Sequence, residues 1–369
     1  MMKLSCCVIV KNEESVLEET LQSVVDRVDE LVIVDTGSTD KTKEIANRFT
    51  NKVFDYPWSG NFAEARNFSV SKASFDWVFI LDADERVIHF DRSMLEIRME
   101  EQRNQPIQVE IRSRQRDGNV SRDKISRIFD RRRFAYAGAI HESIAPITPR
   151  ENEDMALIDG EEKRMTYLDC PIVIDHIGYL EEQLVSNQKL QRNEVMLREA
   201  LLKAPRDSYL MYQLGKTLDL TGKRSDALSF FLQVIGNGEH CSDYWDDLII
   251  SAIYGLTSLN RLQEARDLAD KYRIDEKLTE LADFNFCLAY LDMCTGRFSE
   301  AVAGFVECTR KTKEKVIGSR SWLAYYNLGV IWECLGDFVQ ALEWYQKASN
   351  YGPALERARV ILNKESDKK

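Results

Sequence analysis

The sequence lacks the features that mark a membrane-spanning or disulfide-linked protein. It contains no apolar run of about 18 residues, the length that a membrane-spanning helix needs. Its N-terminus has no positively charged region followed by the apolar segment of a signal peptide. None of its eight cysteines is spaced as C-x-x-C, which favours small buried thiols in a reducing compartment. These absences predict a cytoplasmic protein without an integral membrane segment.

The sequence also has fewer basic than acidic residues. The 50 Lys and Arg residues are outnumbered by 61 Asp and Glu residues, which gives a net charge of −11. Nucleic-acid phosphates bind basic surfaces, so this balance predicts no nucleic-acid partner, although it allows a local basic pocket. Hydrophobic residues make up 44% of the chain, and its length of 369 residues predicts two domains.

The glycine motifs that bind phosphates are missing. No G-x-G-x-x-G follows the first apolar run, and G-x-x-x-x-G-K-[ST] occurs nowhere, so dinucleotide-binding and P-loop folds lose their main support. The first part of the chain nevertheless alternates short apolar runs with helical patterns. The apolar runs cover residues 4–10, 31–34, 53–56 and 77–81. This alternation predicts an α/β domain with a mostly parallel sheet.

Polar groups follow three of these apolar runs: residues 11–13, Asp35, and residues 82–84 in the stretch DWVFILDADER. The carboxyl ends of parallel strands form the edge of a sheet where ligands bind. The Asp-x-Asp of residues 82–84 offers two oxygen ligands to Mg²⁺ or Mn²⁺ and its attached phosphates. Taken alone, this tripeptide is better explained as a polar turn. The three groups together predict a pocket for a nucleoside diphosphate and a metal ion.

Four segments carry a family resemblance through their order and spacing. VIVKNEE, LVIVDTGSTDKT, FAEARN and DWVFILDADE follow one another between residues 4 and 87. As a set they resemble the family 2 glycosyltransferases, whose catalytic domain has the GT-A fold. The resemblance implies a UDP-sugar donor, inversion at the anomeric carbon, and Mn²⁺ or Mg²⁺ as cofactor.

The resemblance also implies roles for individual residues. Asp35 is expected to contact the nucleoside, and Arg66 to help hold the nucleotide. Asp82 is expected to face the ribose or the sugar, and Asp84 to bind the metal. Taken alone, Arg66 is better explained as a surface charge or a structural partner of Asp82 or Glu64. The implied nucleotide-binding positions are Val10, Lys11, Asn12, Glu13, Asp35, Arg66, Asp82 and Ala83.

Two later segments supply candidates for the rest of the site. FAYAGAIHES, residues 134–143, resembles the acceptor side of the family, and its Glu142 is the first candidate for a general base. His141 is the second candidate, because an unperturbed imidazole pKa of about 6.5 suits proton transfer near neutrality. IVIDHIGY, residues 172–179, offers His176 as a further metal ligand, although a buried structural histidine is an open alternative. Residues 148–163 are acidic and are expected to form a flap.

The second half of the chain is helical and repetitive. Four stretches each hold a small residue, then a turn residue, then an alanine five residues later. The small residues are Gly215, Gly255, Ala289 and Gly329, the turn residues are Gly222, Asn260, Gly296 and Gly336, and the alanines are Ala227, Ala265, Ala301 and Ala341. This pattern resembles tetratricopeptide (TPR) repeats, with the last copy as the best match. It predicts closely packed helix pairs and a surface that holds a peptide or another subunit.

The sequence therefore predicts a GT-A nucleotide-sugar-binding domain over residues 1–180, an all-α TPR-like domain over residues 181–362, and a flexible tail over residues 363–369. The expected activity is metal-dependent, inverting transfer from a UDP-sugar. The first acceptor candidate is a peptide or protein Cys or Ser side chain, because bacterial peptide S/O-glycosyltransferases resemble this two-part chain. Surface glycan or lipopolysaccharide core is the second. A non-catalytic TPR scaffold that binds a nucleotide sugar is the alternative from another class, and a homodimer through the repeats is a further partner candidate.

Overall fold

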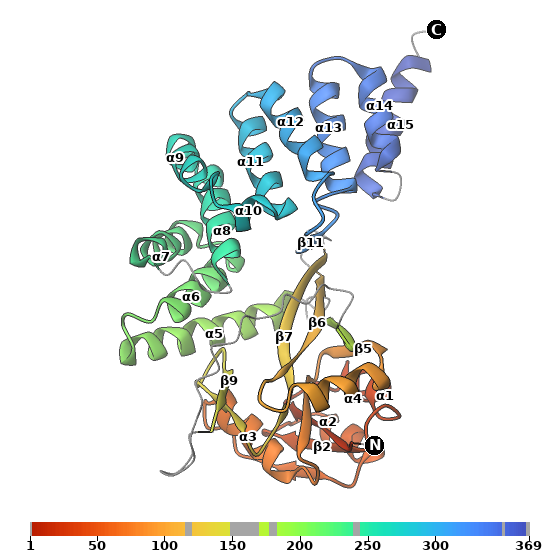
Figure 1. Cartoon of the computed structure of the whole chain (residues 1–369), viewed down its shortest axis with the longest axis vertical. Helices are drawn as coiled ribbons and strands as arrows, with labels where there is room; N and C mark the ends of the chain where they lie inside the picture. The colour runs from red at the N-terminus through yellow and green to blue at the C-terminus, as the bar shows by residue number, and fades with distance from the viewer. Residues whose placement is uncertain are drawn as a thin grey trace. The chain divides into compact units, whose positions relative to one another are not determined.

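The computed structural model describes residues 2–114, 120–147, 170–176, 183–238, 244–348 and 351–366. The chain divides into two compact units (Figure 1). The first consists of Met1–Gly118 and Arg122–Ala200, and the second of Asn119–Ser121 and Leu201–Lys369. The expected flap of residues 148–163 lies outside the described residues. The first unit thus ends at Ala200 and not at the expected residue 180, because most of the helix Gln183–Lys203 groups with the first unit.

The first unit contains strands and helices in alternation. Its strands are β1 Leu4–Val10, β2 Glu30–Asp35, β3 Val53–Asp55, β4 Trp77–Asp82, β5 Glu85–Phe90, β6 Ile107–Arg114, β7 Val120–Asp130, β8 Phe134–Ala137, β9 Ser143–Pro146 and β10 Ile172–His176. Its helices are α1 Leu17–Val24, α2 Thr42–Phe49, α3 Phe62–Lys72, α4 Arg92–Glu101 and α5 Gln183–Lys203. Asn61 caps the start of α3, since its side chain accepts a hydrogen bond from the Glu64 backbone N–H at 3.2 Å.

The large sheet has the strand order β3-β2-β1-β4-β7-β6-β10-β5. The pairs β2–β3, β1–β2, β1–β4 and β6–β10 are parallel, whereas β4–β7 and β5–β10 are antiparallel. The sheet is therefore mixed. The first four strands follow the predicted strand–helix alternation, and the antiparallel strands come from the part of the chain that lacks that alternation. Strands β8 and β9 form a separate hairpin.

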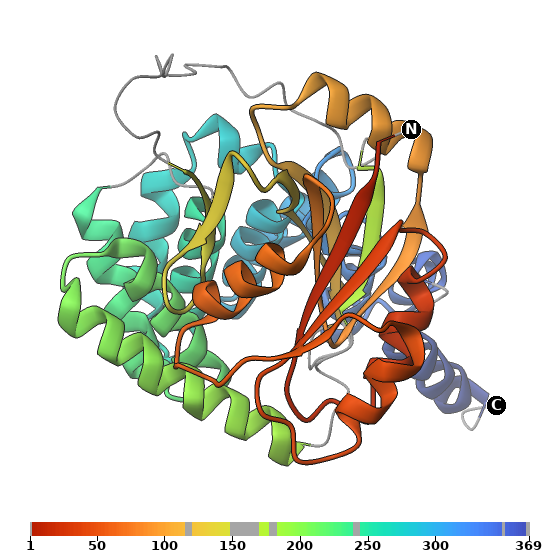
Figure 2. The ribbon, with the colours of Figure 1, turned by 90° about the horizontal axis from the view of Figure 1, so that it is seen from below.

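Helices cover both faces of the large sheet, as Figure 2 shows for α3 on one side and α1 and α2 on the other. Alternate residues of β1 point to opposite faces, as strand geometry requires. Cys6 and Val8 join the core that also contains Leu21 of α1, and Cys7 joins the core that contains Val70 of α3. Burial on both faces explains why β1 is an almost unbroken apolar run.

Residues 112–123 are strongly charged and contain Gly118, a composition that predicts a loop, but most of those that the structure describes belong to strands. Residues 112–114 belong to β6 and residues 120–123 to β7, and residues 115–119 lie outside the described part. The charged side chains in this stretch pair with one another across and along the strands. Glu110 Oε1 is 2.6 Å from Arg112 Nε and 3.8 Å from Arg122 Nε. Opposite charges on one sheet face stabilise strands, so a high charge density does not mark a loop here.

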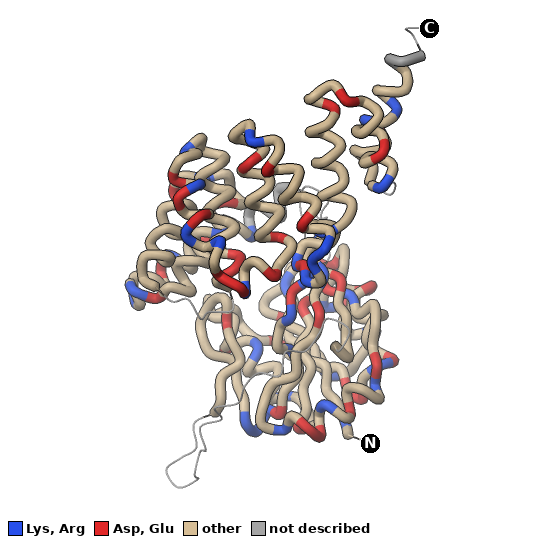
Figure 3. The backbone as a smooth tube through the Cα atoms, turned by 45° about the horizontal axis from the view of Figure 1, so that its top comes forward, with Lys and Arg blue, Asp and Glu red and all other residues tan. Residues whose placement is uncertain are grey.

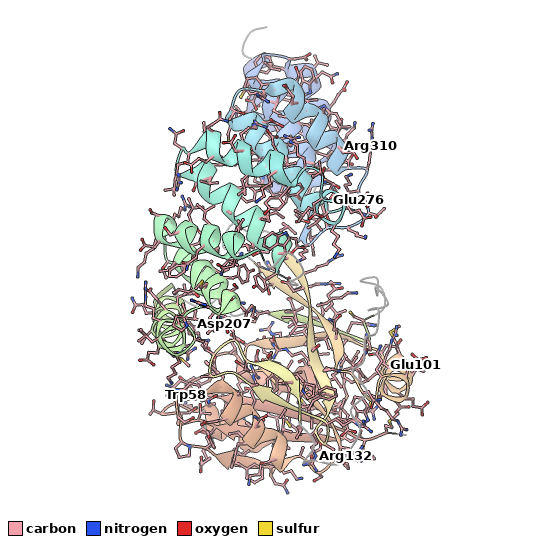
Figure 4. The ribbon with its side chains drawn as sticks, turned by 60° about the vertical axis from the view of Figure 1, so that its left-hand side comes forward. Trp58, Glu101, Arg132, Asp207, Glu276 and Arg310 are labelled. Carbon is pink, nitrogen blue, oxygen red and sulfur yellow. The ribbon has the colours of Figure 1, made fainter. Side chains whose placement is uncertain are left out.

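The second unit is built almost entirely of helices. They are α6 Ser208–Leu220, α7 Arg224–Asn237, α8 Trp245–Ser258, α9 Leu262–Tyr272, α10 Glu276–Thr279, α11 Ala282–Cys294, α12 Phe298–Cys308, α13 Trp322–Cys334, α14 Phe338–Lys347 and α15 Gly352–Ser366, with the short strand β11 Val316–Ile317. Residues 363–366, expected in a flexible tail, continue α15. Figure 4 labels Asp207, whose side chain caps α6 by accepting from the Leu210 backbone N–H at 2.9 Å.

The repeat pattern read from the sequence matches the packing of the helix pairs α6–α7, α8–α9, α11–α12 and α13–α14. All four predicted turn residues have a positive φ, between 58° at Asn260 and 81° at Gly336. A Cβ added to Gly215 would lie 2.5 Å from the Phe231 ring, which is too close for any side chain. The glycine therefore lets α6 pack directly against α7.

Acidic and basic residues are interspersed along both units (Figure 3). Of the cysteines that the structure describes, Cys294 and Cys334 are exposed and the others are buried free thiols, as expected for small core side chains. No helix within the described ranges has the length and apolar character needed to cross a membrane.

Candidate active site

Strand register brings the predicted nucleotide-binding residues to one edge of the sheet. In the parallel pairing of β1 with β2, Val10 lies opposite Asp35. In the pairing of β1 with β4, Ile9 lies opposite Asp82. The polar residues that follow each strand, residues 11–13 and residues 82–84, therefore emerge at the same carboxyl edge. The structure thus places all three predicted groups together.

The loops after β1 and β2 are tied to each other. The buried Asp35 carboxylate accepts from the backbone N–H of Ser38 at 3.1 Å and of Gly37 at 3.4 Å. Gly37 has a φ of 104°, which favours glycine at this turn. The Asn12 side-chain oxygen accepts from the Thr39 backbone N–H at 2.8 Å. These bonds hold both loops in one shape beside the sheet edge.

Asp82 lies between two buried arginines. Arg66 Nη2 is 2.7 Å from Asp82 Oδ1, and Arg127 Nη2 is 2.7 Å from Asp82 Oδ2. Burial alone would raise the pKa of the Asp82 carboxyl, but Arg127 and Arg66 together hold it well below its usual range. Arg127 Nη2 also contacts Glu85 Oε1 at 2.8 Å. Burial raises the pKa of Glu85 in spite of Arg127. Asp82 is consequently a fixed anion at every pH near neutrality.

The FAEARN segment links the sheet edge to the β8–β9 hairpin. Arg66 Nε donates to Glu142 Oε1 at 2.5 Å, so one guanidinium holds both Asp82 and Glu142. The neighbouring Asn67 side chain makes two hydrogen bonds of 2.9 Å with the backbone of Tyr136. The Nη1 group of Arg66 is buried and has no hydrogen-bond partner among the described residues. Arg66 therefore keeps one donor for a bound group.

The two base candidates lie in the turn of that hairpin. Gly138 has a φ of 95° and His141 a φ of 50°, a value that is uncommon for a residue with a Cβ. The turn is fixed to α3, because the Phe62 backbone N–H donates to the Ala139 carbonyl oxygen at 2.8 Å. Burial lowers the pKa of His141, and the charge of Glu142 opposes this effect only in part. His141 is therefore neutral at neutral pH.

The two predicted metal ligands are neighbours. His176 Nε2, at the end of β10, is 3.5 Å from Asp84 Oδ1, and Lys189 Nζ, on α5, is 3.7 Å from Asp84 Oδ2. Burial would raise the pKa of Asp84 but is outweighed by His176 and Lys189, which lower it. Burial would also lower the pKa of His176, yet its hydrogen bond to Asp84 and the nearby carboxylates raise it to about 9.

This donor set suits a divalent cation whose remaining ligands come from the substrate. Within the described ranges, no three His, Cys, Asp or Glu residues are grouped to hold a metal by themselves. One carboxylate and one imidazole fit Mn²⁺ or Mg²⁺ when diphosphate oxygens and water complete the coordination. The residues present therefore fit the implied cofactor as a two-ligand site.

Several site residues escaped the sequence interpretation. They are Arg127, Glu85, Asn67 and Lys189. Arg127 lies in β7, a strand that also carries Arg122 and Lys124, so the sequence does not distinguish it from the other basic residues of that strand. Asn67 was visible as part of FAEARN, but its role depends on the hairpin it contacts. Nothing in the helical pattern of α5 distinguishes Lys189 from a surface lysine.

Comparison with known proteins places this site in a family. A family model described as Glycosyl transferase family 2 matches residues 5–145, and one described as Tetratricopeptide repeat matches residues 322–354. A TPR repeat-containing protein of Synechococcus elongatus is 31% identical over 276 residues, which are 74% of this chain and 66% of that protein. A glycosyltransferase of Rickettsia typhi is 25% identical over 285 residues, or 74% of this chain and 90% of its own. Glycosyltransferase SunS of Bacillus subtilis is 23% identical over 260 residues, which are 65% of this chain and 55% of that protein.

The fold and these matches show a glycosyltransferase domain in the first unit, which is similar to family 2 over residues 5–145. More particularly, the chain joins this domain to a C-terminal tetratricopeptide repeat. The last repeat copy, expected to be the best match, is the one that the family model matches. The chain spans less than two thirds of the Synechococcus and Bacillus relatives.

Proposed function

We propose that the first unit transfers a sugar, with inversion, from a UDP-sugar that binds with Mn²⁺ or Mg²⁺ at the carboxyl edge of β1, β2 and β4. The observation that carries this proposal is the state of Arg66. Its guanidinium is held by Asp82 and Glu142, yet its buried Nη1 has no partner among the described residues. An unsatisfied buried donor costs about 1–3 kcal/mol, and a phosphate oxygen would relieve that cost with a strong charge-assisted bond.

The other edge residues suit the rest of the donor. The Asp35 carboxylate can accept from a uracil N–H or a ribose hydroxyl, and Asp82 from hydroxyls of the ribose or sugar. Residues 10–13 and Ala83 would line the nucleotide. Asp84 and His176 would hold the metal, which supplies positive charge that stabilises the departing diphosphate.

Glu142 is the proposed general base, and His141 is the alternative. The Glu142 carboxyl group pairs with Arg66, so it becomes available to the acceptor as that pairing weakens. A donor diphosphate that takes up Arg66 would weaken it. His141 is already neutral, which is the form that a base needs. Either group would deprotonate the acceptor as its nucleophilic atom attacks the anomeric carbon and UDP departs.

Calorimetry with UDP and Mn²⁺ tests the donor site. In Asp84→Ala, we expect UDP affinity in the presence of Mn²⁺ to fall by about tenfold or more, since even outer-shell partners of a metal contribute that much. Asp270→Ala, which removes an exposed carboxylate of the second unit, serves as the control. UDP binding that needs no metal and is unchanged in Asp84→Ala would disprove the metal role.

Hydrolysis of a panel of UDP-sugars separates an enzyme from a scaffold. A transferase should slowly hydrolyse its own donor, with a rate that depends on Mn²⁺ and on Asp84. For the acceptor we propose a peptide or protein Cys or Ser side chain. The tetratricopeptide repeat in the same chain supports this choice, because such repeats form extended binding surfaces.

A further inference from the structure

Helix α5 brings a lysine to the acids of the donor site. Lys189 Nζ is 3.2 Å from Glu13 Oε1 and 3.7 Å from Asp84 Oδ2. Glu13 follows β1 and Asp84 follows β4, so the ammonium group bridges the ends of two neighbouring strands. The Lys189 side chain is about one-third exposed (32%), and the two carboxylates are less exposed. The contact is therefore partly shielded from solvent.

The same carboxylate carries two positive neighbours. His176 contacts Oδ1 of Asp84, and Lys189 contacts Oδ2. Arg192, one turn further along α5, places its guanidinium 5.3 Å from the Phe62 ring centroid and is attracted by Glu13. Metal binding to Asp84 would bring a divalent charge close to the Lys189 ammonium. Two cations at one carboxylate repel each other, so the lysine and the metal compete for Asp84.

We propose that Lys189 is the resident cation of the donor site, which holds Glu13 and Asp84 together before the donor binds and gives up Asp84 to the incoming metal and diphosphate. The inference rests on the proposed function for the identity of its ligand. A lysine suits this exchange because its ammonium is a compact charge on a flexible stem. Released from Asp84, the ammonium pairs with a phosphate oxygen of the diphosphate and stays close to Glu13.

This exchange has an unusual signature, because removal of Lys189 affects the metal and the nucleotide in opposite directions. Without the lysine, Asp84 has one cation fewer beside it, so Mn²⁺ alone should bind more tightly. The diphosphate, in contrast, loses a charged partner and should bind more weakly. A lysine that only stabilised the fold would weaken both.

The experiment measures the binding of Mn²⁺ alone, and of UDP at saturating Mn²⁺, to the full chain by calorimetry. For Lys189→Met we expect Mn²⁺ affinity to rise severalfold and UDP affinity to fall about tenfold or more, as for a lost charge-assisted hydrogen bond. Lys189→Arg should restore UDP affinity. Lys203→Met, an exposed lysine on the same helix, should change neither. Thermal unfolding of each variant verifies that it is folded.

The outcomes separate this inference from the proposed function. If the native chain binds UDP only with Mn²⁺, but Lys189→Met leaves both affinities unchanged or weakens both, the exchange is overturned and the donor site stands. If the native chain shows no metal-dependent UDP binding, the proposed function fails, and the exchange fails with it. Tighter Mn²⁺ with weaker UDP in Lys189→Met supports both.

Discussion

At the scale of single residues, the site is organised by shared arginines. Arg66 was predicted from its motif to help hold the nucleotide, which stays a prediction, and the structure shows the alternative pairing with Asp82. Arg127 was not predicted, since an arginine in a strand gives no sign of its partner. Only the antiparallel register of β7 against β4, which sets Ile128 opposite Phe79, brings it to Asp82. Long-range register of this kind cannot be read from local patterns.

The two base candidates can be separated by substitution. In Glu142→Gln we expect the transfer rate to fall by about 100-fold or more, the usual contribution of a general base. His141→Ala should retain most of the rate. A full rate in Glu142→Gln together with no transfer in His141→Ala would reverse the assignment. UDP binding to both variants serves as the control, since neither change removes a proposed metal ligand.

The pH dependence of the same variants gives a second readout. Burial lowers the pKa of His141, so its imidazole stays neutral to a lower pH than an ordinary imidazole does. If His141 is the base, transfer should therefore decline only as the pH falls below about 6.5, the ordinary imidazole pKa. Such a decline that disappears in His141→Ala would identify His141 as the group that must be unprotonated. A decline that persists in that variant belongs to another group.

At the scale of helices and strands, the sequence was most informative at positions where close helix packing leaves room for glycine alone. The repeat glycines are such positions, as Gly215 and Gly329 lie directly against the aromatic rings of Phe231 and Tyr345. The strands β6 and β7 were harder, because charges that pair between neighbouring strands look like loop composition when read along one strand. In β7, only the last four residues, Arg127 to Asp130, are buried, so most of the strand lacks the apolar run that marks a buried strand.

Gly329→Ala tests the close packing of α13 on α14. A Cβ at this position would lie 2.5 Å from the Tyr345 ring, and Tyr345 is almost fully buried. We expect a loss of about 1–3 kcal/mol in the free energy of unfolding, as for other overpacked cores. Gly236→Ala is the matched control, since its Cβ meets nothing within 4 Å on α7. Alanine favours helices over glycine, so this control should be neutral or stabilising. Equal stability of both variants would contradict close packing at Gly329.

At the scale of the whole molecule, we expect the first unit to bind the donor and the second unit to recruit the acceptor. The residues proposed to bind the donor all lie in the first unit, which includes Lys189 because α5 groups with that unit as far as Ala200. The repeat helices contribute none of them. Donor chemistry and recruitment of a protein acceptor should therefore be separable by truncation, and an acceptor that is a glycan should not need the repeats.

Removal of all residues after Ala204 tests this division. We expect the shortened chain to retain Mn²⁺-dependent UDP binding and slow donor hydrolysis, because the proposed donor site remains whole. Transfer to a protein acceptor should fall to background, because the repeats no longer hold the acceptor close to the anomeric carbon in a reactive orientation. A second truncation after Lys311, which removes the matched repeat of residues 322–354, shows whether that repeat alone is required. Undiminished transfer by the chain that ends at Ala204 would mean that the repeats do not recruit the acceptor. Loss of UDP binding by the same chain would show that α5 depends on the helices that follow it.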